Sequence, residues 1–173
     1  MSSRAKRKSF SAPSWRKGCF LIYSGNFDWK CRNQSWLDLE NIAVVEITSE
    51  EKEFPIESAL LPGEQRGWRA AVSGSQTIRL RFDQPRRLTR IWLSFEERQA
   101  IRTQEFVLRF SSEAAGPLRD IVRQQWNFSA PNAVREIEDY AVALFDVTIL
   151  ELNIVPDTSG GPARASLLSL RVA

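Results

Sequence analysis

Apolar and polar residues alternate along most of the chain from about residue 42 onward. In "QTIRLRF" (76–82), Ile78, Leu80 and Phe82 share one face, while a threonine and two arginines occupy the other. A period of two is typical of strands that bury one face and expose the other to water, as in antiparallel sheets. Segments of this kind are predicted as strands at 42–48, 76–82, 89–95, 105–110, 120–128, 137–144, 147–155 and 165–172.

Short clusters of turn-forming residues separate the predicted strands. Three of them are Asp83-Gln84-Pro85, Ala115-Gly116-Pro117 and Ala130-Pro131-Asn132, and a fourth is the Pro- and Gly-containing segment 156–162. No segment keeps a helical period over three turns, and only 56–61 is predicted to form a single helical turn. About eight strands at this spacing predict an all-β antiparallel sandwich or barrel.

Residues 1–40 differ from the rest of the chain and are predicted to form a basic, partly irregular extension of a domain that spans 41–173. Positive charge gathers here, at Arg4, Lys6, Arg7, Lys8, Arg16 and Lys17. Such an arm could contact nucleic acid, although a solvated terminus is the interpretation that we favour. Aromatic residues are also scattered through this extension, so part of 19–40 is expected to pack on the sandwich as an extra strand or cover.

Composition argues against an enzyme and against a cofactor. The chain contains no histidine, so Ser-His and Cys-His nucleophile pairs are excluded. Cys19 and Cys31 fit no zinc-site spacing, and without an export signal two free thiols are expected rather than a disulfide. No apolar run approaches the length needed to span a bilayer, which favours a cytoplasmic protein that does not bind membranes.

Three segments resemble the galactose-binding-domain-like superfamily, which includes discoidin (coagulation-factor C-type) domains and several carbohydrate-binding modules. They are "FPIESALLPGEQRGWRAA" (54–71), "SQTIRLRFDQPRRLTRIWL" (75–93) and the pair "DYAVALFDV" and "ARASLLSLRV" near the end of the chain. The resemblance covers roughly 42–173. It implies an antiparallel jelly-roll sandwich of about eight strands, with any ligand site in loops at one end.

The same resemblance allows a metal site to be tested. Many members of the superfamily hold a structural calcium with an Asp-Gly in the opening loop and a Glu in the last strand. Here the opening loop reads Leu61-Pro62-Gly63-Glu64, and Ser169 stands where the Glu would fall. Losing both carboxylates removes most of the charge that calcium needs, so no bound metal is expected.

"RGWR" (66–69) is the first candidate binding segment. Trp68 corresponds to a loop tryptophan of the superfamily, and because a tryptophan buries so much apolar surface we favour a core position for it. Arg66 and Arg69 beside it could flank a sugar or an acidic partner, or could simply be solvated, which is the interpretation that we favour.

"RQQWNFSAPN" (123–132) is the second candidate, since Arg123, Trp126, Asn127 and Asn132 combine an aromatic platform with guanidinium and amide groups, as sugar sites do. The alternation nevertheless places Trp126 on the same face as Phe128 and Val122, which favours the core. Arg123 and Asn127 then lie on the opposite face.

An alternative surface combines Arg79, Arg81 and Arg90 with Trp92, all on polar faces of predicted strands. This basic-aromatic face could suit phosphate or single-stranded nucleic acid, or could be an ordinary wet sheet face. Two hypotheses follow. The first is a non-catalytic module that binds a carbohydrate or a protein surface through end loops, and the second is a nucleic-acid-associated or complex-scaffolding domain.

Overall fold

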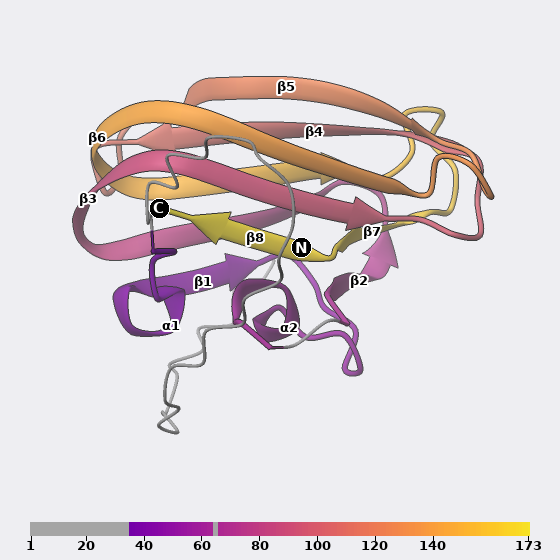
Figure 1. Cartoon of the computed structure of the whole chain (residues 1–173), viewed down its shortest axis with the longest axis horizontal. Helices are drawn as coiled ribbons and strands as arrows, with labels where there is room; N and C mark the ends of the chain where they lie inside the picture. The colour runs from indigo at the N-terminus through magenta and orange to yellow at the C-terminus, as the bar shows by residue number, and fades with distance from the viewer. Residues whose placement is uncertain (1–34, 64–65) are drawn as a thin grey trace, which may run out of the picture.

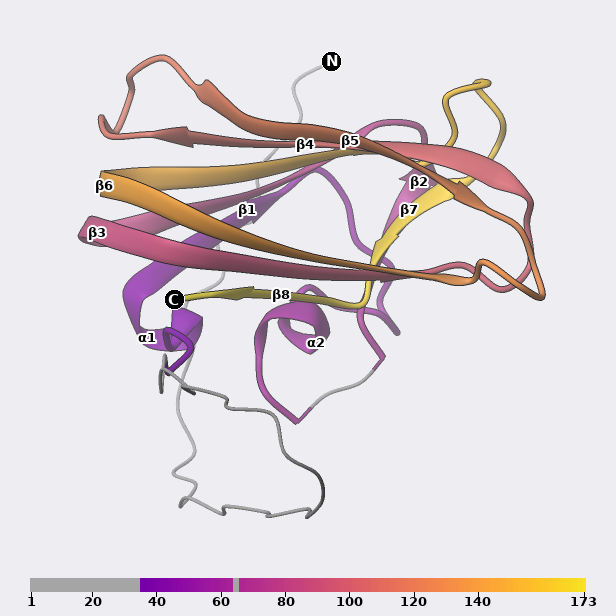
Figure 2. The same ribbon diagram turned by 45° about the horizontal axis from the view of Figure 1, so that its top comes forward.

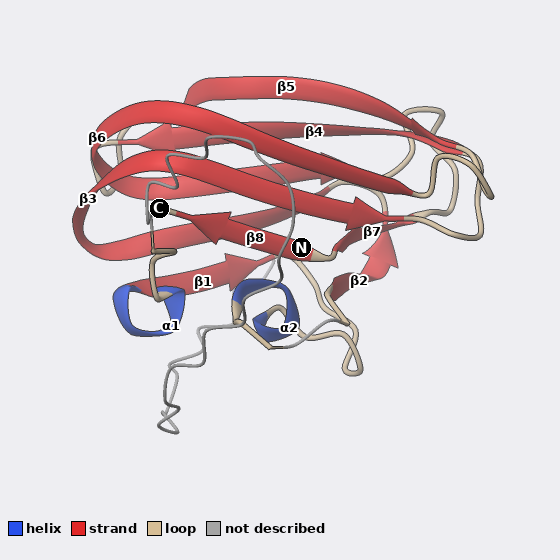
Figure 3. Ribbon diagram, in the orientation of Figure 1, coloured by secondary structure: helices blue, strands red, loops and turns tan. Residues whose placement is uncertain are grey.

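A computed structural model describes residues 35–63 and 66–173 as an antiparallel β structure with two short helices (Figure 1 and Figure 3). Every strand pairing in this part is antiparallel, which confirms the all-β sandwich. The elements in chain order are α1 (Leu39–Ile42), β1 (Ala43–Ile47), α2 (Glu57–Leu60), β2 (Trp68–Ser73), β3 (Gln76–Glu96), β4 (Arg102–Ser111), β5 (Arg119–Phe128), β6 (Arg135–Val155), β7 (Arg164–Leu167) and β8 (Ser169–Val172).

The two longest strands, β3 and β6, bend near their midpoints and so belong to both layers of the sandwich. The first half of β3 pairs with β1 and with the second half of β6, which also pairs with β4. The second half of β3 pairs with the first half of β6 and with β8. Figure 2 shows the two layers, with β4 and β5 above and β8 below.

The continuity of β3 and β6 corrects the predicted segmentation. We predicted separate strands at 76–82 and 89–95, and again at 137–144 and 147–155, but each pair is one strand of 21 residues. Pro85 falls between Arg81 and Arg86, where the register is irregular, so its missing N–H interrupts no regular ladder. Asp146, with a φ of 55°, marks the bend of β6.

The last predicted strand, 165–172, is two strands instead of one. The chain leaves β7 at Leu168, whose N–H donates to the carbonyl of Ser94 at 2.8 Å, and continues as β8 along β3. β7 pairs with β2, which we did not predict as a strand because only Trp68 and Ala70 of its six residues are buried. The two-stranded sheet of β2 and β7 lies at one end of the sandwich (Figure 1).

The core confirms the inward faces expected from the alternation. Ile78, Leu80 and Phe82 are buried, and so are the predicted inward residues Ile91, Leu93, Phe95, Phe106 and Leu108. The rings of Phe95 and Phe106 stack across the sandwich with centroids 5.2 Å apart. The single helical turn predicted at 56–61 is present as α2.

Residues 35–40 pack on the sandwich, as part of the expected cover. The N–H of Leu37 donates to the carbonyl of Val172 at 2.8 Å, and Leu39 is 3% exposed. The basic residues 4–17 and both cysteines, Cys19 and Cys31, lie outside the described residues. Within the described residues, no helix has the length and apolar character required to cross a membrane.

Candidate functional site: an arginine-lined groove

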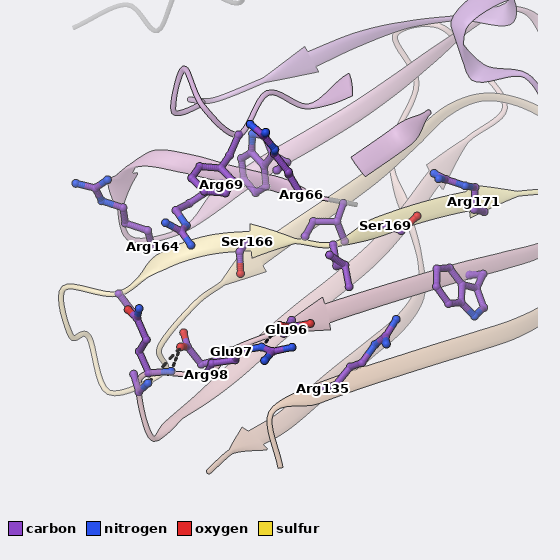
Figure 4. A pocket seen from close by; sticks show the side chains of 18 of the residues that line it. Arg66, Arg69, Glu96, Glu97, Arg98, Arg135, Arg164, Ser166, Ser169 and Arg171 are labelled. Carbon is purple, nitrogen blue, oxygen red and sulfur yellow. Dashed lines mark hydrogen bonds and ion pairs between the residues drawn. The ribbon is translucent and has the colours of Figure 1, made fainter. Parts of the chain in front are cut away.

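A groove of about 1270 Å³ lies beside the β2–β7 sheet, at the end of the sandwich where β3 ends. Its lining includes two tryptophans, Trp36 and Trp92, and two glutamates, Glu96 and Glu97. The arginines that the described part of the chain contributes to this lining are Arg66, Arg69, Arg98, Arg135, Arg164 and Arg171. In Figure 4, Arg66, Arg69 and Arg164 lie on one side of β7, and Glu96, Glu97 and Arg98 lie on the other. We call this site the arginine groove.

The pairing of β2 with β7 turns one set of side chains inward and the other toward the groove. Trp68 faces Leu167 in the ladder, and both are buried, at 1% and 0% exposed. The next pair is Arg69 with Ser166, and because side chains alternate along a strand both point away from the core. The core position predicted for Trp68 is confirmed, and Arg69 reaches the groove because it follows Trp68.

Arg69 and Arg164 share a single carboxylate, that of Glu51. Nη1 of Arg69 lies 3.8 Å from Oε2 of Glu51, and Nη1 of Arg164 lies 3.6 Å from Oε1. These distances exceed the 2.7–2.9 Å typical of a charge-assisted hydrogen bond. The guanidinium of Arg69 also lies 4.4 Å above the ring of Phe54. Both arginine side chains are about half exposed, so their N–H donors remain accessible from the groove.

Gly67 allows Arg66 and Trp68 to leave the turn in different directions. Its φ is 70°, a value that glycine adopts readily and other residues rarely do. A Cβ at this position would lie 2.6 Å from the carbonyl oxygen of Leu167, so the turn packs directly on β7. Arg66 is exposed and lines the groove, and within the described residues it has no hydrogen bond or ion pair.

The opposite wall is the loop 97–100, which Glu97 and Arg102 hold in place. Oε1 of Glu97 accepts hydrogen bonds from the N–H groups of Gln99 and Ala100 at 2.8 and 3.2 Å, and Oε2 accepts from Nε of Arg102 at 2.9 Å. Burial alone would raise the pKa of Glu97, but these three donors outweigh burial and lower it below its usual value. Arg98 in the same loop pairs with Glu96.

Arg135 and Arg171 line the rest of the groove from β6 and β8. Nε of Arg135 donates to Oγ of Ser94 at 3.3 Å. Arg171 has a structural role, because its guanidinium donates to the carbonyls of Ala59, Leu61 and Leu170, each at 2.9 Å. Burial lowers the pKa of Arg171 from its usual value. These bonds tie the end of α2 to β8 and form the floor beside the opening loop.

The two tryptophans supply the apolar part of the lining. Trp92 is partly buried on the outer face of β3, and Trp36 is 39% exposed. The guanidinium of Arg90 lies 4.9 Å above the ring of Trp36 and donates two hydrogen bonds to Asp139, at 2.7 and 2.6 Å. This guanidinium lowers the pKa of Asp139. Arg90 is therefore engaged beside the groove and orients Trp36.

The structure brings only some of the predicted site residues together. Arg66, Arg69 and Trp92 all line the arginine groove, although we placed Trp92 on a different surface from the two arginines. Glu51 lies outside the lining but contacts two of the groove arginines, Arg69 and Arg164. The groove residues that we did not single out include Arg98, Arg135, Arg164 and Ser166. No local pattern distinguishes these from other arginines and polar residues, because they enter the groove through pairings between distant strands.

The predicted set in 123–132 lies elsewhere, on β5 and the loop that follows it. Arg123 pairs with Glu105 at 2.6 Å on the outer face, while Trp126 is partly buried against the core. Asn127 accepts a hydrogen bond from the hydroxyl of Thr103 at 2.7 Å and lines a smaller hollow of about 320 Å³. Asn132 is exposed in the loop. The structure therefore does not gather these four side chains into one site.

The alternative basic-aromatic face is divided by the bend of β3. Arg79 and Arg81 lie on its first half, where Arg79 donates to Glu151 at 2.9 Å and both arginines lie within 4 Å of Glu46. Arg90 and Trp92 lie on the second half, in the other layer. The four residues do not form one continuous face, and carboxylates neutralise the arginines on each half.

A buried acidic side chain lies inside the sandwich, apart from the groove. Glu136, on β6 opposite Phe95, is 1% exposed, and neither of its oxygens has a hydrogen-bond partner within the described residues. Burial raises the pKa of Glu136 to about 7, and the nearby charge of Glu138 contributes to the shift. Burial and Glu138 also raise the pKa of Tyr140. The carboxyl group of Glu136 is therefore readily protonated near neutral pH.

This raised pKa predicts a stability that falls as pH rises. Between about 4.5 and about 7 the folded state holds a proton on Glu136 that the unfolded state releases, so the free energy of unfolding decreases across this window. Glu136→Gln is expected to remove this slope and to be more stable than the wild type at pH 8, by at most about 3 kcal/mol. Urea titrations at a series of pH values measure the free energy of unfolding of each variant, with Glu53→Gln on the surface as control. If the free energy of unfolding had the same pH dependence in both variants, Glu136 would not be its source.

The described residues contain no group of three or more His, Cys, Asp or Glu side chains that could hold a metal ion. Ser169, the residue that stands in place of the superfamily's glutamate, begins β8 and lines the groove. That the chain binds no calcium remains a prediction.

Comparisons with known proteins relate the chain to solved structures. No protein-family model matches it, and no curated protein matches it either. The family 32 carbohydrate-binding module of AlyQ, in complex with 4,5-unsaturated mannuronic acid, has 16% identity and a TM-score of 0.55, covering 77% of this chain and 95% of that one. The family 32 module of C. perfringens NanJ, in complex with galactose, has 14% identity and a TM-score of 0.54, covering 75% and 92%.

A chitosan-binding module from a Paenibacillus sp. IK-5 chitosanase/glucanase gives a similar result, with 14% identity, a TM-score of 0.55, and coverage of 78% of this chain and 97% of that one. Identities this low establish the fold and leave the ligand open. The resemblance drawn from the sequence is confirmed at this level: the chain has the galactose-binding-like jelly-roll fold.

Proposed function

We propose that this protein is a non-catalytic binding module that takes a saccharide into the arginine groove. The observation that carries the proposal is the lining itself, in which Trp36 and Trp92 lie among guanidinium groups and the hydroxyls of Ser166 and Ser169. An aromatic ring accommodates the C–H face of a sugar, and guanidinium and hydroxyl groups bond to its oxygens. The solved modules with the same fold, which hold galactose or an unsaturated uronic acid, support this assignment.

The proposal of a non-catalytic role rests on the chemistry available to the chain. Without histidine, general acid–base catalysis would rest mainly on carboxylates. In the groove, Glu96 pairs with Arg98 and Glu97 pairs with Arg102, which leaves both carboxylates bound to guanidinium groups. A carboxylate held in this way is a poor proton donor, so binding rather than hydrolysis suits the site.

A glycan array of neutral and acidic oligosaccharides, followed by calorimetric titration of the hits, tests the proposal. We expect Trp36→Ala and Trp92→Ala each to weaken binding about tenfold, since an aromatic platform contributes about 1–1.5 kcal/mol. Phe145→Ala is the matched control, because Phe145 is 58% exposed and lies outside the groove lining. Thermal melts of each variant separate lost binding from lost folding. A folded protein that binds no oligosaccharide would contradict the proposal, and so would equal losses in the groove and control variants.

A further inference from the structure

The arginine groove has more positive charge than its own carboxylates neutralise. Arg98 is engaged by Glu96, and Arg171 is engaged by three backbone carbonyls. Arg66 has no partner among the described residues, and the guanidinium of Arg135 forms one hydrogen bond among them, to the hydroxyl of Ser94. The other two arginines, Arg69 and Arg164, share one carboxylate.

Three arginines elsewhere on the described surface lie closer to a carboxylate than Arg69 and Arg164 do. Arg90 lies 2.6 Å from Asp139, Arg109 lies 2.9 Å from Asp120, and Arg123 lies 2.6 Å from Glu105. Each of these carboxylates belongs to the strand beside its arginine, so these three charges are neutralised locally. Arg69 and Arg164 in the groove lack a carboxylate at such a distance, so their positive charge is less closely neutralised.

Glu51 is the carboxylate that Arg69 and Arg164 share among the described residues. It lies between Arg69 and Arg164, at 3.8 and 3.6 Å, which is within Coulombic range but beyond a normal hydrogen bond. Its Oε2 is buried and accepts no hydrogen bond from the described residues. Glu51 is held by its backbone, whose N–H donates to the carbonyl of Arg69 at 2.9 Å. The guanidinium groups can therefore turn toward a second carboxylate without breaking a hydrogen bond to the first.

We propose that the saccharide bound in the arginine groove is acidic, and that its anionic group binds between Arg69 and Arg164 in competition with Glu51. The ligand class is a sugar bearing a carboxylate or a sulfate, since guanidinium groups match the oxygens of either anion with paired N–H donors. Arg66 and Arg135 provide further positive charge for the next acidic unit of a chain. This inference rests on the proposed saccharide-binding function.

The test titrates the full chain with four probes, which are an oligogalacturonate, a neutral galactose oligomer of equal length, a sulfated galactose oligomer and a single-stranded DNA. Arg69→Gln/Arg164→Gln is expected to weaken acidic oligosaccharide binding at least about 30-fold. Glu51→Gln is expected to tighten it about fivefold, because it removes a competing charge close to both arginines. Neither change should affect a neutral oligomer by more than about twofold, and added salt should weaken only the acidic complexes.

Arg119→Gln/Arg123→Gln is the matched control, because it removes the same charge from exposed positions of β5 that do not line the groove. Thermal melts confirm that each variant is folded. Equal binding of neutral and acidic oligomers, with no effect of Glu51→Gln, would overturn this inference while the saccharide-binding function stood. Binding of DNA alone, with the same arginine dependence, would overturn both, and so would no binding at all. The ratio of oligogalacturonate to sulfated oligomer binding identifies which anion the groove prefers.

Discussion

Replacing Arg102 with methionine is expected to lower the free energy of unfolding by about 3–5 kcal/mol, because it leaves the largely buried carboxylate of Glu97 without its cation. The Arg102 side chain is 2% exposed. Its guanidinium donates to Glu97 at 2.9 Å and to the side-chain oxygen of Gln104 at 3.1 Å, and it also donates to the carbonyl of Pro156. Methionine fills a similar volume but satisfies none of these acceptors.

The control for Arg102→Met is Arg123→Met, which removes an ion pair on the surface. Arg123 lies 2.6 Å from Glu105, but its side chain is 54% exposed, so the expected loss is below about 1 kcal/mol. Denaturant titrations of both variants give the comparison. Similar losses would show that burial does not govern the contribution of Arg102.

Replacing Arg102 should also loosen the loop that forms one wall of the arginine groove. Glu97 holds the N–H groups of Gln99 and Ala100, and Arg102 holds Glu97, so the loop wall depends on this one guanidinium. At temperatures where Arg102→Met remains folded, we therefore expect weaker saccharide binding, whereas Arg123→Met should bind as the wild type does.

Gly67→Ala is expected to lower the free energy of unfolding by about 2–4 kcal/mol, the second large effect. At a φ of 70° an alanine is strained, and its Cβ would lie 2.6 Å from the oxygen of Leu167 and 2.8 Å from the Cα of Leu168. Both contacts are backbone atoms, at the end of β7 and in the connection to β8, so β2 must shift away from β7. Denaturant titration measures the loss.

Gly160→Ala separates the two causes of that loss. Gly160 has a φ of 82°, but a Cβ there would meet nothing within 4 Å, so only the backbone strain of about 1 kcal/mol applies. The difference between the two variants isolates the contact with β7. Equal losses would contradict the close packing of the turn that carries Arg66 and Trp68.

The arginine groove forms only when the sandwich closes. Arg69 comes from β2, Arg164 from β7 and Arg135 from β6, and the loop after β3 forms the facing wall. These elements meet only when β7 pairs with β2 and β8 pairs with β3. A variant that opens the β2–β7 pairing should therefore lose the proposed binding site before it loses the main sheet.

The inward faces, the helical turn at 56–61 and the burial of Trp68 could all be predicted from the amino-acid sequence. Each follows from a local rule: alternation with a period of two assigns a side chain to one face of a strand, and a tryptophan favours burial because of its area. These rules need no knowledge of which strands are neighbours. Ile78, Leu80 and Phe82 accordingly lie in the core where their spacing placed them.

The continuity of β3 and β6 could not be predicted in this way. Asp83-Gln84-Pro85 has the composition of a turn, and the chain does change direction there. However, whether such a segment ends a strand or bends it depends on whether the partner strand bends with it. β6 does so at Asp146, and the ladder resumes beyond the irregular register.

The residues of the arginine groove could not be predicted from the sequence for the same reason. Arg69 and Arg79 look alike in the sequence, since each is a polar residue between buried apolar ones. Arg79 meets a carboxylate 72 positions away, that of Glu151, and forms a close pair with it. Arg69 meets Glu51 only at 3.8 Å, shares it with Arg164, and faces a groove. The availability of an arginine for a ligand depends on which carboxylate the distant strands bring beside it, and this is a property of the folded chain.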